Sequence, residues 1–155
     1  MTESPDHVRV AIPPPVIFAS YLIGALLLNW VLPLPAPWLD FTRALGGLLV
    51  VSGLLLGASA IRLMTIAHTS PDLHKPTTAL VTEGLYAHSR NPIYLGLFVI
   101  YLGFGLMAGT LWGILLSPFL LLTVDRAVIQ AEETYLQQRF ESRYSQYKAR
   151  VHQWL

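Results

Sequence analysis

Four apolar segments constrain the fold of this chain more than any other feature. They span residues 16–32, 44–67, 92–108 and 110–124. As helices, the shorter segments would be about 22–26 Å long at 1.5 Å per residue, close to the roughly 30 Å hydrocarbon core of a bilayer. Because the 155 residues are 54% hydrophobic and only 12% charged, too little polar surface remains to cover such helices in water. We therefore predict an all-α integral membrane protein with about four transmembrane helices.

The length of the chain fits a single domain over residues 1–155. Residues 1–67 would hold the first two transmembrane helices, and residues 68–155 a polar loop, a helical hairpin and a C-terminal helix. Gly109 alone joins the third and fourth apolar segments, which predicts a tight antiparallel hairpin. The glycine-rich run at 46–57 predicts close helix packing, either within one chain or between chains, so the oligomeric state stays open.

The basic residues are distributed unevenly between the two ends of the predicted bundle. If the N-terminus is cytoplasmic, only Arg43 lies on the opposite side. The cytoplasmic side would carry Arg9, Arg62, Lys75, Arg90, Arg126, Arg139, Arg143, Lys148 and Arg150. The positive-inside rule therefore predicts a multi-pass protein of the inner (plasma) membrane with both termini in the cytoplasm.

Composition also argues against several classes of function. A net charge of +1 gives no basic surface for nucleic acid, and the absence of cysteine excludes disulfides and thiolate chemistry. The histidines His68, His74 and His88 lack the spacing of a metal site. We expect neither a nucleic-acid partner nor a metal.

The C-terminal segment is an amphipathic helix with one anomalous residue. Its apolar and aromatic positions recur every three or four residues, which predicts a cytoplasmic helix with a bend near Glu141. Glu132 lies four residues after Val128 and four before Leu136, so it falls on the apolar face. A carboxylate on a packed face is costly unless it meets a cation. Glu132 is therefore a candidate ligand-binding residue, with an internal salt bridge to Arg90 or Arg126 as the alternative.

Two polar clusters should meet in space. One is the loop 74–94 before the third apolar segment, and the other is the segment 131–140 after the fourth. In an antiparallel hairpin the start of one helix and the end of the other are neighbours. The resulting pocket would hold Arg90 and Glu132 with three tyrosines nearby, and it suits a ligand with a cationic amine, a carboxylate and a flat ring. The nearby tyrosines are Tyr86, Tyr94 and Tyr135. Taken singly, Arg90 and the tyrosines also fit interfacial anchors.

The stretch LVTEGLYAHSRNPIYLG, residues 80–96, resembles a signature of the isoprenylcysteine carboxyl methyltransferase family. The later stretch AEETYLQQRFESRYSQYKARV, residues 131–151, is similar to the second signature of that family. The family is a membrane branch of the S-adenosylmethionine enzymes that includes phospholipid N-methyltransferases. The resemblance runs from about Pro71 to Val151, whereas the first two apolar segments match only in character.

The resemblance implies S-adenosylmethionine as cofactor and Glu132 as the residue that receives its ammonium group. By position it also implies cofactor contacts at Thr78, Ala79, Leu80, Val81, Tyr86, Asn91, Pro92, Ile93 and Tyr94. One departure concerns the acceptor. The eukaryotic prenylcysteine enzymes carry an arginine for the substrate carboxylate where this chain has Val128, and Arg126 lies about 200° away on a helix.

We predict a membrane methyltransferase that acts on an amphipathic or lipid-like acceptor: a prenylcysteine-type carboxylate, or a phospholipid amine or thiol. Arg90 is a candidate catalytic residue that positions the acceptor or binds the cofactor carboxylate. Glu133 is a second, with His88 as an alternative, for removing a proton from an amine acceptor. Two other functions stay open, an NADPH-dependent reductase of the sterol-reductase type and a membrane module without catalysis.

Overall fold

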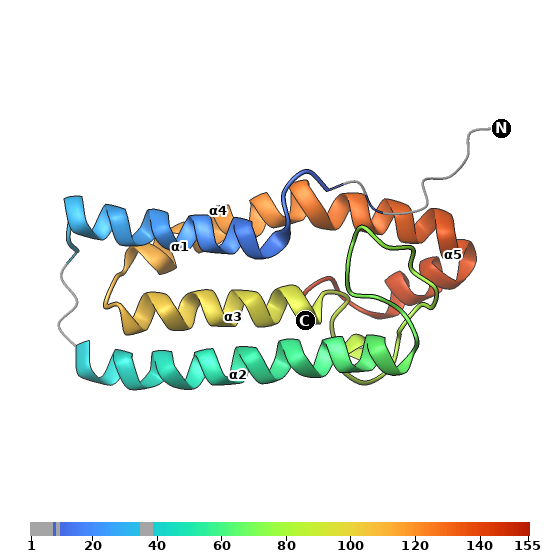
Figure 1. The fold of residues 1–155 in the computed structure, drawn as a ribbon, viewed down its shortest axis with the longest axis horizontal. Helices are drawn as coiled ribbons and strands as arrows, with labels where there is room; N and C mark the ends of the chain where they lie inside the picture. Colours follow the sequence, from blue (N-terminus) through green and yellow to red (C-terminus); the bar gives the residue numbers. More distant parts are fainter. Residues whose placement is uncertain (1–7, 9, 35–38) are drawn as a thin grey trace.

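The computed structural model describes residues 8, 10–34 and 39–155. Within these described residues five α-helices follow one another (Figure 1): α1 (Pro14–Val31), α2 (Leu39–Ile66), α3 (Pro92–Met107), α4 (Trp112–Val124) and α5 (Gln130–Arg150). A 3-10 helix, η1 (Gly84–Ala87), precedes α3, and a π-helical turn, η2 (Asp125–Ile129), joins α4 to α5. The part of the chain that the structure describes contains no strand. The predicted all-α fold is confirmed.

Proline and glycine set the helix boundaries. Pro14 and Pro92 each occupy the first turn of a helix, where the missing N–H breaks no intrahelical bond. Gly109 adopts φ 69° in the turn between α3 and α4, a conformation that glycine reaches without strain. The predicted hairpin is confirmed, but its turn spans residues 108–111 rather than Gly109 alone. Helix α2 also begins earlier than its apolar segment, at Leu39.

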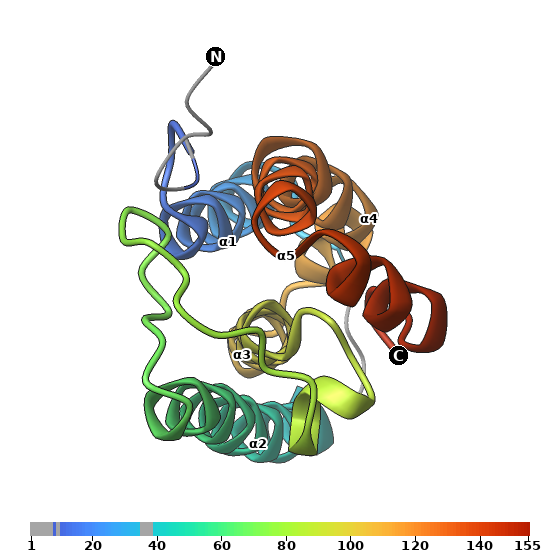
Figure 2. The same cartoon turned by 90° about the vertical axis from the view of Figure 1, so that its right-hand side faces the viewer.

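Helix α3 lies along α2, as the end-on view shows (Figure 2), and glycines set the contact. A Cβ atom added to Gly46 would lie 2.6 Å from the Gly103 carbonyl oxygen, and one added to Gly53 would lie 2.7 Å from that of Gly96. Only glycine lets two helix backbones approach this closely. The glycine-rich run of α2 therefore packs within the chain.

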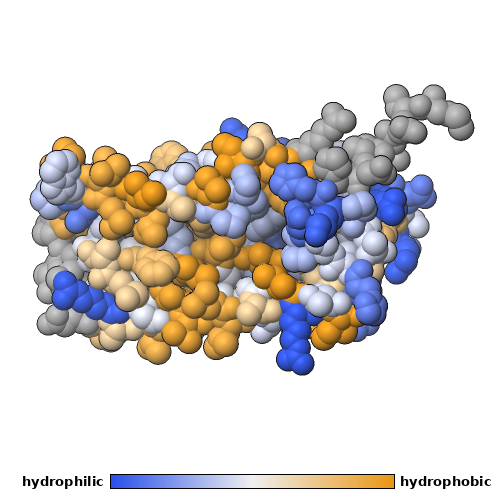
Figure 3. Space-filling view, viewed as in Figure 1, coloured by the Kyte–Doolittle hydropathy of each residue, from blue (hydrophilic) through white to orange (hydrophobic). Residues whose placement is uncertain are grey.

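The outer surface of the helices is apolar. Helices α1 and α2 are long and apolar enough to cross a membrane, and so is the continuous helix that begins with α4; α3 is shorter. Exposed side chains such as Leu27, Leu55 and Phe119 point outward from α1, α2 and α4. The space-filling view shows apolar residues over most of this face and charged residues gathered at the end that holds α5 (Figure 3). This surface is that of a multi-pass membrane protein.

The charge asymmetry predicted from sequence has a structural counterpart. Arg43 lies near the start of α2, at the opposite end of that helix from Arg62. Arg62 shares its end of the bundle with the loop before α3 and with α5, which carry most of the other basic residues. Arg9 lies outside the described residues. The side that faces the cytoplasm stays a prediction.

Candidate functional site

A cavity of about 290 Å³ lies where α1 begins, α2 ends, and α3 and α5 begin. The loop 67–83 runs from the end of α2 toward α1 and returns to the 3-10 helix η1 (Figure 2). Several residues of this loop line the cavity. The polar part of the wall comes from α3, α5 and the residues just before α3, and the loop 67–83 adds Ser70, Asp72, His74 and Thr77. The polar part includes Tyr86, Arg90, Asn91, Tyr94, Glu132, Glu133, Tyr144 and Tyr147. The two polar clusters predicted to meet do line one pocket.

The apolar part of the wall comes from α1, α2, α3, the segment before α1 and the loop 67–83. It includes Val8, Val10, Pro13, Pro14, Ile61, Met64 and Leu97. Val8 is held in place by its backbone N–H, which donates to the Leu73 carbonyl oxygen at 3.1 Å. We call the polar wall formed by α3, α5 and the residues just before α3 the charged side of the cavity. We call the apolar wall formed by α1, α2 and the segment before α1 its apolar side.

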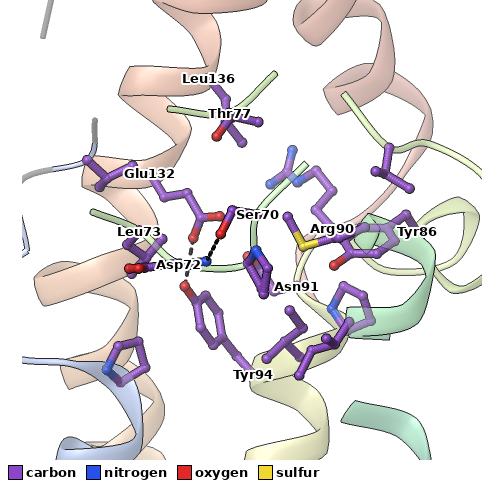
Figure 4. Close-up of a pocket in the computed structure, with 18 of the residues that line it drawn as sticks. Ser70, Asp72, Leu73, Thr77, Tyr86, Arg90, Asn91, Tyr94, Glu132 and Leu136 are labelled. Atoms are coloured by element: carbon purple, nitrogen blue, oxygen red, sulfur yellow. Dashed lines mark hydrogen bonds between the residues drawn. The ribbon is translucent and has the colours of Figure 1, made fainter. Parts of the chain in front are cut away.

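Glu132 lies in the first turn of α5 and lines the cavity. Its carboxylate accepts a hydrogen bond from the Tyr94 hydroxyl at 2.8 Å (Figure 4). A cation in the cavity would favour the ionised carboxylate. The placement explains why an acidic residue falls on the apolar face of this helix.

Arg90 and Glu133 form a buried ion pair beside Glu132. The Arg90 Nη2 atom lies 2.7 Å from Glu133 Oε1, and their side chains are only 8% and 16% exposed. Lys148 approaches the other Glu133 oxygen at 2.6 Å from the second half of α5. Arg90 Nε is buried and has no hydrogen-bond partner among the described residues. This donor is free for an anionic group of a ligand.

Nearly all predicted cofactor residues line the cavity. They are Ala79, Leu80, Val81, Tyr86, Asn91, Pro92, Ile93, Tyr94 and Glu132. Thr78 instead donates its hydroxyl to the His68 carbonyl oxygen at 2.6 Å, and its neighbour Thr77 lines the cavity. Whether these residues bind a cofactor stays a prediction.

Sequence reasoning missed two tyrosines of the wall, Tyr144 and Tyr147. Glu141 adopts φ 46°, ψ −117°, and this kink lies at the bend that was predicted. The second half of α5 thereby reaches the 3-10 helix, where the Tyr147 hydroxyl donates to the Tyr86 carbonyl oxygen at 2.7 Å. Tyr135, expected near the pocket, accepts the Thr77 N–H at 3.1 Å and so fastens the loop.

Several other candidate residues lie elsewhere. His88 is exposed and is absent from the cavity wall, whereas His74 lines it. Val128 is buried in the hydrophobic core, and Arg126 is exposed. Val128 therefore presents no cation where the prenylcysteine enzymes carry arginine. The described residues contain no group of three or more His, Cys, Asp or Glu side chains that could hold a metal ion.

Comparison with known proteins identifies the family. The profile of the phospholipid methyltransferase family matches residues 41–143, well over half of the chain. The chain belongs to this family. The matched part contains α2 from residue 41 on, α3, α4 and every predicted site residue, and it leaves α1 and residues 144–155 outside the match.

A curated relative agrees with this assignment. The protein-S-isoprenylcysteine O-methyltransferase of Schizosaccharomyces pombe is 32% identical over 110 residues, which cover 71% of this chain and 47% of the relative. The chain thus spans about half the length of that relative. No solved structure matches the chain. The family resemblance read from the two signatures is confirmed.

Proposed function

We propose that this family member is an S-adenosylmethionine-dependent methyltransferase that acts on an amphipathic or lipid-like acceptor. The observation that carries the proposal is the pairing of Glu132 with Arg90 in one cavity wall. A buried carboxylate and a buried guanidinium with a free Nε donor match the ammonium and carboxylate of an amino-acid group. The family match favours methyl transfer over the reductase alternative.

The residues of the wall fit the proposed cofactor. When bound, S-adenosylmethionine supplies a methyl group on a positively charged sulfur. Glu132 would bind the ammonium group and Arg90 Nε the carboxylate, while Ala79, Leu80 and Tyr86 would lie along the flat base. The remaining proposed contacts with S-adenosylmethionine are Thr78, Val81, Asn91, Pro92, Ile93 and Tyr94.

Glu133 has two proposed tasks. Its ion pairs with Arg90 and Lys148 hold the guanidinium in place, which fixes the direction of the Nε donor. With an amine acceptor, the same carboxylate would take the proton that the nitrogen must lose. An acceptor that is already a carboxylate or thiolate would need no such base.

The apolar side of the cavity supports an acceptor with a hydrocarbon part. Pro14, Ile61 and Met64 line it from α1 and α2, two helices that also carry many exposed apolar side chains. A lipid-like tail would find apolar contacts there while its polar head reached the charged side. The membrane itself is then the reservoir of the acceptor. We also propose that the cavity opens to the cytoplasmic side, with both termini there.

Filling the apolar side should separate acceptor binding from cofactor binding. We expect Met64→Trp to raise KM for a long-chain acceptor about tenfold, because its bulk would occupy the space for the chain, and to change KM for S-adenosylmethionine little. Ile66→Trp is the matched control, since Ile66 is exposed on the same helix and is absent from the wall. Equal KM values for the acceptor in the two variants would contradict this placement.

Transfer of a labelled methyl group tests the function. Purified protein in detergent is incubated with S-adenosylmethionine carrying a tritiated methyl group and with a prenylcysteine, an amine phospholipid or a lipid thiol. We expect label in at least one organic-soluble product, and far less label with Glu132→Gln at the same concentration of S-adenosylmethionine. Folded protein that binds no S-adenosylmethionine would overturn the proposal.

A further inference from the structure

The chain beyond α5 returns to the start of α3. Val151 is extended (φ −120°, ψ 128°), which ends the helix and turns the tail 151–155 back. The Arg90 N–H donates to the His152 carbonyl oxygen at 3.0 Å. The Asn91 side-chain amide and the Ser89 hydroxyl donate to the Gln153 carbonyl oxygen at 3.1 and 3.3 Å. Three consecutive residues before α3 are thus fastened to the tail.

The side chain of Gln153 reaches the turn that leads into α5. Its Nε2 donates to Asp125 Oδ1 at 2.6 Å, and the Gln130 amide donates to the other Asp125 oxygen at 2.8 Å. Asp125 opens the π-helical turn η2, which inserts one residue into the helical repeat before Glu132. One extra residue rotates all later positions by about 100°. The turn therefore sets the direction in which Glu132 points.

Gln153 consequently contacts one segment of the charged side of the cavity and the turn that leads into α5. Its backbone oxygen binds Asn91, and its side chain binds Asp125. Trp154, the next residue, packs against the hydrophobic core and anchors the tail. Gln153 itself is absent from the cavity wall, so it would act through the residues it holds.

We propose that Gln153 is a positioning residue that holds Asn91 and the π-helical turn in register, and thereby sets the geometry in which Glu132 and Arg90 receive the cofactor. This inference rests on the proposed function. It concerns the tail of this chain, which lies outside the residues that match the family. A tail that only capped α5 would need its backbone contacts but not the amide of Gln153.

The test uses Gln153→Ala in the full-length protein in detergent. We expect about tenfold weaker binding of S-adenosylhomocysteine by calorimetric titration, because one charge-assisted hydrogen bond that orients the site is lost. We also expect faster amide hydrogen exchange over residues 89–94 in the ligand-free protein. His152→Ala is the matched control, since His152 is exposed and contacts Arg90 only through its backbone oxygen.

Reversing the hydrogen bond between Gln153 and Asp125 distinguishes a positioning role of Gln153 from a general loss of stability. Gln153→Glu sets two carboxylates against each other and should bind more weakly than Gln153→Ala. Adding Asp125→Asn should restore binding of S-adenosylhomocysteine and slow amide hydrogen exchange over residues 89–94. The asparagine amide can donate to the new carboxylate while its oxygen still accepts from Gln130.

The proposal would be overturned if Gln153→Ala kept the wild-type affinity for S-adenosylhomocysteine and the wild-type rate of amide hydrogen exchange. It would also be overturned if the double variant Gln153→Glu with Asp125→Asn bound no better than Gln153→Glu. If Gln153→Ala does not fold, the comparison of Gln153→Glu with the double variant Gln153→Glu and Asp125→Asn tests the proposal. If wild type binds no S-adenosylhomocysteine, the proposed function fails, and exchange over residues 89–94 still tests whether Gln153 positions this segment.

Discussion

Glu132→Gln should weaken binding of S-adenosylmethionine by about 100-fold while the protein stays folded. Glutamine keeps the shape of the side chain and an oxygen that accepts the Tyr94 hydroxyl, but it removes the negative charge that faces the cavity. Loss of one partner from a buried charge pair costs about 2–5 kcal/mol, and a factor of 100 corresponds to about 2.7 kcal/mol. Calorimetric titration of the two proteins in the same detergent measures the difference.

Glu83→Gln is the matched control for this substitution. Glu83 is exposed before the 3-10 helix and is absent from the cavity wall, so its neutralisation should leave the affinity unchanged. The variant also changes the net charge by the same amount, which controls for long-range electrostatics. Affinities within threefold for wild type and Glu132→Gln would show that Glu132 does not receive the ammonium group.

Gly46→Ala should lower the stability of the folded bundle, whereas Gly47→Ala should not. A Cβ atom at Gly46 would lie 2.6 Å from the Gly103 carbonyl oxygen and 2.8 Å from the Met107 backbone nitrogen, so α2 and α3 would have to separate. Overpacking of this kind costs about 1–3 kcal/mol. A Cβ atom at Gly47 would meet no atom within 4 Å, and alanine there gains up to about 1 kcal/mol of helix propensity.

Thermal unfolding in a mild detergent compares the two variants with wild type. We expect a Tm several degrees lower for Gly46→Ala and unchanged or slightly higher for Gly47→Ala. The two positions are adjacent in sequence and carry the same substitution, so differences in detergent or expression affect both alike. Equal Tm values would contradict the observed packing of α2 on α3.

Local patterns were sufficient to predict the helices and the most unusual residue. The four apolar segments coincide with α1 to α4 except at their ends, and the three-to-four spacing placed Glu132 on the apolar face. The hairpin argument then joined two clusters some forty residues apart. Each of these inferences needs only neighbours along one helix or one turn.

Contacts that depend on long-range geometry were not predictable. The π-helical turn at 125–129 contains no proline or glycine to mark it. The contact of Gln153 with Asp125 depends on where the kink at Glu141 directs the rest of α5. For the same reason Tyr144 and Tyr147 were read only as apolar positions of a helix, although they line the cavity.

The most direct test of the proposed function is titration of the folded wild-type protein with S-adenosylmethionine and, separately, with NADPH. The buried carboxylate and the free guanidinium donor lead us to expect micromolar binding of S-adenosylmethionine and no heat from NADPH. Binding of NADPH without S-adenosylmethionine, or of neither ligand by protein shown to be folded, would contradict a methyltransferase site built on Glu132 and Arg90.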